Sequence, residues 1–242
     1  MTLGGKVAVM AGGSSGIGAA CARLLATAGA QVVVGYNKGA DRAAALVAEL
    51  PGNGHQALYL PMEDSGQIRK AAATVRRADI LINSAGFTRM VPHADLEALD
   101  DDLIDAMLRV HVRGPLAMIR AFAPLLRATG NGVVINISSG AAQHGTGSSI
   151  IYGAAKAAVN TMSMALARVL GPEIRVIVVA PGLVRTGFVP GRTEEEMAAV
   201  AAARPLRRPI EADDVAQAVM ACITHLACTT GSIIPVDAGQ HL

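Results

Sequence analysis

The chain has 242 residues, 52% of them hydrophobic, and a formal net charge of +2. This near balance, with Lys and Arg spread along the chain, gives no basic surface for nucleic acid or an anionic membrane, so we expect a small-molecule partner. The three cysteines form no Cys-x-x-Cys pair, and no signal-peptide pattern or long uncharged apolar run is present, so we expect a cytoplasmic protein without a disulfide or zinc framework.

Short β-branched segments alternate with longer Ala-rich and Leu-rich segments of helical period. This alternation is the pattern of βαβ units and predicts a parallel sheet. No repeat or linker divides the chain, so we predict an α/β fold with one domain over residues 1–242, a doubly wound sheet with helices on both faces. The seven expected strands are Lys6–Met10, Gln31–Gly35, Ala57–Leu60, Asp79–Asn83, Gly132–Ser138, Ile174–Ala180 and Ser232–Val236.

The first strand leads into a glycine-rich turn and then an Ala-rich helix. Glycines let the backbone turn sharply and approach a pyrophosphate, whose negative charge is favoured by the helix N-terminus. A tight turn without a ligand is the alternative. We predict that the turn binds the phosphates of a dinucleotide through Gly12, Ser14, Ser15, Gly16, Ile17 and Gly18.

The spacing Gly12-x-x-x-Gly16-x-Gly18 resembles the nucleotide loop of the short-chain dehydrogenase/reductase family. Later motifs extend this resemblance over essentially the full length: Asn83-Ser84-Ala85-Gly86 is similar to the family's Asn-Asn-Ala-Gly, and Pro181-Gly182-x-Val184-x-Thr186 is similar to its nicotinamide-contacting segment. Within the family, the chain most resembles the 3-oxoacyl-acyl-carrier-protein reductases. The resemblance implies a Rossmann-type fold and further cofactor contacts at Met62, Asn83, Ala85, Gly86, Pro181, Gly182, Val184 and Thr186.

Tyr152 and Lys156 are four residues apart in a segment, 151–170, of helix-compatible composition. Their side chains therefore share one helix face, where the ammonium should favour the phenolate and lower the pKa of the phenol. Tyr152 can then exchange a proton with a substrate oxygen while hydride passes to or from a nicotinamide. Ser139 matches the family's catalytic serine and would hold that oxygen by a hydrogen bond. The resemblance also places Tyr152 and Lys156 in contact with the cofactor.

The family's catalytic tetrad adds an Asn, and the matching position here is His111. Pro115 has no N–H to donate to the His111 carbonyl, so this carbonyl should be free to hold the water that leads to the family's lysine. We hypothesise that His111 preserves the relay through its backbone and buffers it with its ring. A packed histidine behind a damaged relay is the alternative.

Histidines could also serve in two other ways. The six histidines show no metal-ligating spacing, so we expect no metal. His144 lies in the expected loop between Ser139 and Tyr152, where it could contact substrate or simply be solvated.

The segment after the second strand bears on the choice of nicotinamide. Tyr36, Asn37 and Lys38 stand where an acidic residue would bind an unphosphorylated ribose, so we favour NADP(H) over NAD(H), with Lys38 available to a 2′-phosphate. NAD(H) stays open, because Ser15 replaces the family's frequent loop Arg and Pro61 replaces a frequent Asp near the adenine.

We expect an NAD(P)(H)-dependent enzyme that interconverts a carbonyl and a secondary alcohol, with a 3-oxoacyl thioester as the leading substrate. The least regular stretch, residues 182–209, follows the carboxyl end of a strand and is expected to form a substrate flap; a plain surface excursion is the alternative. Arginines around it could meet an acidic carrier or lie solvated: Arg192, Arg204, Arg207 and Arg208.

Other functions remain open from the sequence. The chain could act on a sugar, polyol or xenobiotic ketone, or, in a different class, could be a catalytically weak NADP-binding regulator or scaffold. The resemblance also implies a homodimer or homotetramer, and we expect no nucleic-acid or membrane partner.

Overall fold

The computed structural model describes residues 2–242 and contains a seven-stranded parallel sheet in the order β3-β2-β1-β4-β5-β6-β7. The expected α/β architecture and all seven expected strands are confirmed, each strand ending within one residue of its predicted bounds. The strands are β1 (Val7–Ala11), β2 (Gln31–Tyr36), β3 (Gln56–Tyr59), β4 (Ile80–Asn83), β5 (Gly132–Ile137), β6 (Ile174–Pro181) and β7 (Ile233–Val236).

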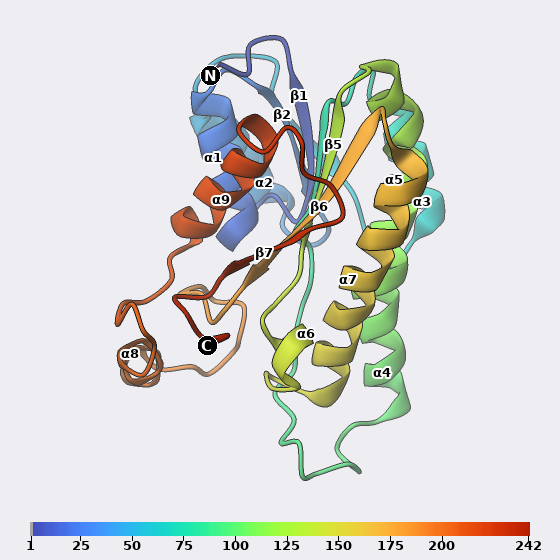
Figure 1. Cartoon of the computed structure of the whole chain (residues 1–242). Helices are drawn as coiled ribbons and strands as arrows, with labels where there is room; N and C mark the ends of the chain where they lie inside the picture. Colours follow the sequence, from blue (N-terminus) through green and yellow to red (C-terminus); the bar gives the residue numbers. More distant parts are fainter. Residues whose placement is uncertain (1) are drawn as a thin grey trace.

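Helices cover both faces of the sheet, which gives three layers (Figure 1). One face carries α1 (Gly16–Thr27), α2 (Ala40–Glu49) and α9 (Ala212–Thr224). The opposite face carries α3 (Ser65–Thr74), α4 (Asp101–Leu108), α5 (Gly114–Ala128) and α7 (Ile150–Leu170). A π-helical turn, η1 (Arg109–Arg113), joins α4 to α5, and a short α6 (Ala141–His144) precedes α7.

The sheet forms the centre of two apolar cores. Side chains alternate along a strand, so Met10 packs under α1 while its neighbour Val9 faces the α3 and α5 side. Both faces are buried, which explains why the central strands read as almost continuous apolar runs. Fully burying one such Val or Leu side chain contributes about 1.5–3 kcal/mol to folding.

The order of the strands determines where a ligand can bind. The chain builds the sheet outward from β1 to β3, then returns to the other side of β1 with β4 and continues to β7. The loops that leave β1 and β4 therefore diverge, and this switch point is where open α/β sheets bind ligands. Gly12 and Ala85, which follow β1 and β4, lie against each other there.

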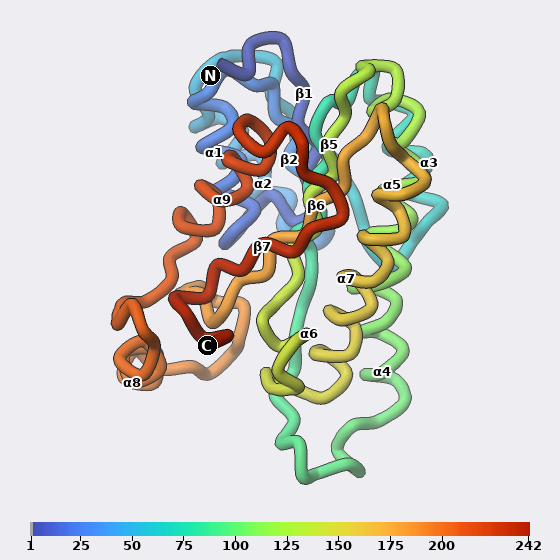
Figure 2. The backbone as a smooth tube through the Cα atoms, in the orientation of Figure 1, coloured from blue at the N-terminus to red at the C-terminus, as the bar shows by residue number. Residues whose placement is uncertain are grey.

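The segment expected to be irregular, residues 182–209, contains a nine-residue helix, α8 (Glu194–Ala202). The expectation is wrong for these residues because a capping box begins the helix: Thr193 accepts from the Glu196 N–H, and Glu196 accepts from the Thr193 N–H. Figure 2 shows the C-terminal end of the chain next to the segment that carries α8.

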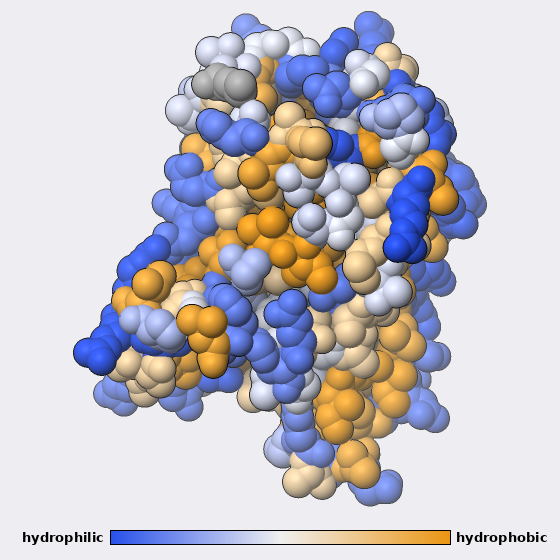
Figure 3. All heavy atoms as spheres, in the orientation of Figure 1, coloured by the Kyte–Doolittle hydropathy of each residue, from blue (hydrophilic) through white to orange (hydrophobic). Residues whose placement is uncertain are grey.

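The surface carries some apolar groups outside these cores. Figure 3 shows apolar atoms over β7 and over the part of α7 next to α6, where Ile150 is 43% exposed. Within residues 2–242, none of the helices combines the length and the hydropathy that a membrane crossing would need.

Candidate active site

A cavity of about 730 Å³ opens at the carboxyl ends of the central strands. It is walled by the loops that follow β1, β4, β5 and β6, by the start of α7 and by the segment 182–204, which contains α8. The structure brings thirteen of the predicted site residues to this one cavity: Gly12, Ser15, Gly16, Ile17, Ala85, Gly86, Ser139, Tyr152, Lys156, Pro181, Gly182, Val184 and Thr186.

The turn between β1 and α1 has the shape that a pyrophosphate requires. Gly12 has φ +72°, and a Cβ at this position would lie 2.6 Å from the Ala85 Cα. Gly18 lies behind it, because a Cβ there would be 2.1 Å from the Gly12 carbonyl oxygen. Ser15 is the N-cap of α1, but its side chain makes no capping hydrogen bond, so the first N–H groups of α1 remain available. These residues fit the phosphates of a dinucleotide.

Tyr152, Ser139 and Lys156 converge in the same cavity. Ser149 caps α7 by accepting from the Tyr152 N–H at 3.3 Å, which places Tyr152 in the first turn of the helix. Ser139 lies near the Tyr152 hydroxyl, and the Ser139 hydroxyl oxygen accepts from the Ala141 N–H at 3.2 Å. One turn later, the Lys156 ammonium donates to the Ile137 carbonyl at 2.8 Å and lies 5.7 Å from the centre of the Tyr152 ring.

Burial dominates the acid–base properties of this group. It raises the pKa of Tyr152 to about 12, against the smaller lowering effect of the nearby Ser139 side chain. It also lowers the pKa of Lys156 to about 8. The expected lowering of the Tyr152 pKa is therefore wrong in direction for the protein alone, and Tyr152 holds its proton at neutral pH.

His111 lies in the π-helical turn, where the Gly114 N–H bonds the carbonyl five residues earlier, that of Arg109. The helix is therefore distorted next to Pro115, which is where the sequence predicted a free His111 carbonyl. The role of this carbonyl in a proton relay stays a prediction. Its ring contacts the Phe87 carbonyl oxygen through Nε2 at 2.8 Å and meets the Tyr152 ring edge-on at 5.6 Å.

The environment of the His111 ring argues against the buffering role. Burial, with the nearby Lys156 charge as a smaller cause, lowers the pKa of His111 to about 3. The ring is therefore neutral at physiological pH and holds no exchangeable charge. Among the described residues, its Nδ1 has no hydrogen-bond partner although it is buried.

The structure places the remaining predicted residues outside the cavity lining. Asn83 donates to Asn136 inside the sheet at 2.8 Å, and Asn37 donates to Glu63 at 2.8 Å. Met62 packs against Gly114. His144 ends the short α6 rather than lying in a loop, and it is exposed. The predicted residues that do not line the cavity are Ser14, Gly18, Tyr36, Asn37, Lys38, Met62, Asn83 and His111.

Sequence reasoning missed several residues of the cavity. Arg42 on α2 packs its guanidinium across Gly39, where a Cβ would lie only 2.5 Å from an Arg42 nitrogen, and reaches the cavity that Ser15 and Gly16 line. Arg42 stands four residues after Lys38, outside any motif, so only the α2 geometry identifies it. Other lining residues without a motif signal are Thr88, Ser148, Phe188 and Gln240.

Several known proteins are similar to this chain in sequence and in fold. Residues 11–241 match a family model described as enoyl-(acyl carrier protein) reductase. Ketoacyl reductase 2 of the granaticin polyketide synthase from Streptomyces violaceoruber is 35% identical, with 98% of this chain and 96% of the relative covered. The cis-4-hydroxycyclohexanecarboxylate dehydrogenase of Sinomonas cyclohexanicum is 34% identical over 97% and 96%. A Burkholderia cenocepacia short-chain dehydrogenase in complex with NADP superposes with a TM-score of 0.89 at 33% identity, covering 100% of both chains.

Proposed function

The chain belongs to the short-chain dehydrogenase/reductase family and is an oxidoreductase, and from this premise we propose that it interconverts a ketone and a secondary alcohol at Tyr152. The observation that carries the proposal is the position of Tyr152 and Ser139 on the wall of one cavity, with Lys156 one helical turn from Tyr152. Such a group can move a proton at a substrate oxygen, which is what carbonyl reduction needs.

Each of the three side chains has a distinct task in this reaction. Tyr152 donates its phenolic proton to the oxygen of the ketone as negative charge develops there. Ser139 donates a hydrogen bond to the same oxygen and keeps it beside Tyr152. Lys156 holds a positive charge near the phenol and stabilises the phenolate that is left. When bound, the nicotinamide cofactor supplies the hydride, or accepts it in the reverse direction.

The protonated state of Tyr152 is the form that ketone reduction uses. Its pKa of about 12 means that the acid form is already present at neutral pH. Alcohol oxidation needs the phenolate form of Tyr152 as a base. The rate of oxidation should therefore rise with pH, whereas the rate of reduction should not.

NADP(H) is the proposed cofactor. Arg42 lines the cavity with Ser15 and Gly16, close to the phosphate-binding turn, and can pair with a 2′-phosphate. In the part of the chain that the structure describes, no Asp or Glu lines the cavity to bind an unphosphorylated ribose. Titration of the protein with NADPH and with NADH tests this preference, and tighter binding of NADH would refute it.

A 3-oxoacyl thioester is the leading candidate substrate. One relative is a ketoacyl reductase by name and another acts by name on a hydroxycyclohexanecarboxylate. Because the substrates in these two names differ, a sugar, a polyol or a xenobiotic ketone stays the alternative substrate. Faster turnover of acetoacetyl thioesters than of free ketones would favour the thioester.

The decisive experiment is a screen of ketones, thioesters and secondary alcohols with both nicotinamides, run beside Tyr152→Phe. We expect turnover with NADPH, and a loss of about 100-fold to 10,000-fold in kcat for the variant, because it lacks the proton donor. Full activity in Tyr152→Phe would refute the proposed role of Tyr152. Tight NADPH binding without any turnover would instead favour the regulator or scaffold.

We also propose that the chain forms a homodimer or homotetramer. The proposal follows the family resemblance and is supported by apolar side chains exposed on α7, including Met164 at 40% and Val169 at 68%. Light scattering coupled to size-exclusion chromatography tests it, and a monomer at micromolar concentration would refute it.

A further inference from the structure

We propose that the flap end of the cavity binds an anionic group of the substrate through Arg204, assisted by Arg192. The group is an oxyanion, either a carboxylate of the substrate itself or a phosphate on the arm of a thioester. This inference rests on the proposed function because it names the class of substrate that the same cavity accepts.

Arg204 is a buried cation on the cavity wall. Only 6% of its surface is exposed, and it follows α8 at the point where the chain turns back toward the sheet. Its guanidinium donates to the Leu183 carbonyl at 3.3 Å and to the Gln240 side-chain oxygen at 3.0 Å. Both acceptors are neutral, and the buried Nε has no partner among residues 2–242.

Within the described chain, no carboxylate pairs with Arg204 at salt-bridge distance. Asp237 acts on it only at longer range. The oxygens of Asp237 are occupied, since they accept from the Gly239 N–H and from the His241 N–H and ring. A buried charge without an ion-pair partner is costly to the fold, so its position on a cavity wall indicates that a ligand provides the counter-charge.

The charge of the whole cavity lining supports the same conclusion. Among residues 2–242, the lining includes four basic residues, Arg42, Lys156, Arg192 and Arg204, and no acidic one. Lys156 serves Tyr152, and Arg42 accompanies the phosphate-binding turn. The cofactor phosphates therefore explain the positive charge at the α1 end of the cavity. They provide no anion for Arg192 and Arg204.

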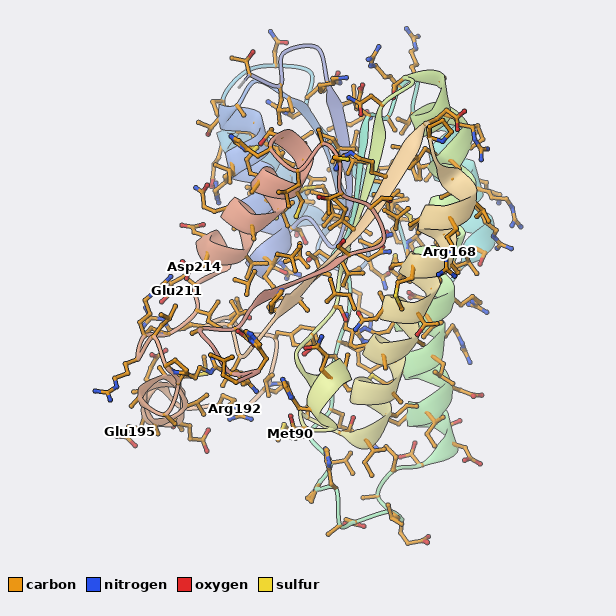
Figure 4. The ribbon with its side chains drawn as sticks, in the orientation of Figure 1. Met90, Arg168, Arg192, Glu195, Glu211 and Asp214 are labelled. Carbon is orange, nitrogen blue, oxygen red and sulfur yellow. The ribbon has the colours of Figure 1, made fainter. Side chains whose placement is uncertain are left out.

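Arg192 lies just before α8 and is free to assist. Figure 4 shows it on the side of α8 that faces α6, while Glu195 points outward. The other carboxylates at the start of α8 are engaged, because Glu194 pairs with Arg185 and Glu196 belongs to the capping box. Arg192 is exposed, so water screens its charge and we assign it the smaller share of binding.

Arg204 is also connected to the reactive centre. Its acceptor Leu183 follows Pro181 by two residues, and the Pro181 carbonyl accepts from the N–H of Gly140 at 2.8 Å. Gly140 is the residue after Ser139, so short backbone links connect the anion-binding end to the serine that orients the ketone. Arg204 and Ser139 also line the same cavity, so a substrate with a carbonyl at one end and an anion at the other can lie between them.

The first test uses the unaltered protein with NADPH. Methyl ketone acids of increasing length (4-oxopentanoate, 5-oxohexanoate and 6-oxoheptanoate) are compared with their methyl esters, which have the same ketone but no charge. We expect at least one acid to exceed its ester by about tenfold to a hundredfold in kcat/KM, the worth of a charge-assisted hydrogen bond. Acetoacetyl phosphopantetheine and acetoacetyl pantetheine form the matching pair for a phosphate.

The second test uses variants. Arg204→Met should abolish the preference for the charged member of the pair, Arg204→Lys should keep part of it, and Arg192→Met should reduce it less. Arg207→Met is the matched control: it removes the same charge from the same segment, but Arg207 is exposed and lies outside the cavity lining. The dissociation constant of NADPH should not change in any of these variants.

A binding measurement separates this inference from the proposed reaction. Calorimetric titration of hexanoate into the NADPH complex should show binding that hexanol lacks and that Arg204→Met loses, even if no ketone is turned over. A preference confined to the phosphopantetheine pair would identify the anion as a phosphate. Equal kcat/KM for charged and neutral partners without hexanoate binding, or equal losses for both partners in Arg204→Met, would overturn the inference.

Discussion

The ring of His111 is buried between Phe87 and Tyr152, and its charge state follows from that position. With Nε2 at 2.8 Å from the Phe87 carbonyl oxygen, the neutral ring donates through Nε2 and leaves Nδ1 as an acceptor. Protonation would place a second positive charge near Lys156 in a site that water does not reach. The pKa of His111 is accordingly lowered from 6.5 to about 3.

This pKa predicts how His111 affects stability as pH changes. The unfolded chain protonates His111 below pH 6.5, whereas the folded protein does so only near pH 3. The stability linked to the neutral ring is therefore complete above pH 6.5 and is lost as pH falls through this window, by up to about 1.4 kcal/mol per pH unit.

His111→Asn removes this titration and tests the prediction. Between pH 6.5 and pH 5, the unaltered protein should lose about 2 kcal/mol more unfolding free energy than the variant. Urea denaturation at the two pH values measures the unfolding free energy of each protein. Comparing the loss between the two pH values cancels any packing cost of the substitution that does not depend on pH. Equal losses in both proteins would show that His111 titrates normally.

The connection between β1 and α1 depends on the backbone at Gly12. Its φ of +72° costs an L-residue about 1–2 kcal/mol, and a Cβ would also meet the Ala85 backbone at 2.6 Å. Gly5 is a matched control, because it has φ +76° and a Cβ there would have no heavy atom within 4 Å.

Gly12→Ala should therefore destabilise the protein more than Gly5→Ala, by about 1–3 kcal/mol from the added crowding. It should also weaken NADPH binding, because the crowded turn belongs to the phosphate site. Chemical denaturation and cofactor titration of both variants measure these effects. Equal destabilisation by Gly12→Ala and Gly5→Ala would mean that the loop after β4, which contains Ala85, moves away from the added methyl group without a cost in stability.

The elements differ in how far sequence predicted them. The central strands β1, β2, β4, β5 and β6 were predictable because their apolar runs are buried on both faces and end at glycine or polar residues, whereas β3 is largely exposed. The helix α8 was not, because its Ala-rich and Glu-rich segment buries only two residues, Met197 and Ala201, and shows no clear apolar stripe. The Thr193 and Glu196 pair was its one readable signal.

The candidate site shows the same division. Short local motifs contain Tyr152, Lys156 and the glycine turn, so the spacing of the motifs was enough to predict these residues. The direction of the Tyr152 pKa depends on burial by distant segments, which spacing does not reveal. Arg42 and Arg204 reach the cavity from α2 and from the end of α8, and only the tertiary fold distinguishes them from solvated arginines such as Arg207.

For the molecule as a whole, the distribution of charge matters more than its sum. The net charge of +2 is small, yet the described residues that line the cavity include four basic ones and no acidic one. The partly enclosed site concentrates this positive potential where anionic ligands enter. Ligand binding should therefore weaken as ionic strength rises, and more for NADPH than for NADH.

Arg42→Met tests the cofactor part of this charge. We expect the dissociation constant of NADPH to rise about tenfold to a hundredfold, because a charge-assisted contact with the 2′-phosphate is lost. NADH binding should be nearly unchanged. Arg168→Met removes the same charge from an exposed position on α7 (Figure 4) and should affect neither cofactor. Equal weakening of NADPH and NADH would place Arg42 away from the 2′-phosphate.

The contact between Gln240 and Arg204 has a practical consequence for anyone who purifies the protein. Gln240 lines the cavity two residues before the end of the chain, whereas the first strand begins on the far side of the molecule (Figure 2). Residues fused after Leu242 would be separated by only two residues from Gln240, which lines the cavity and holds Arg204.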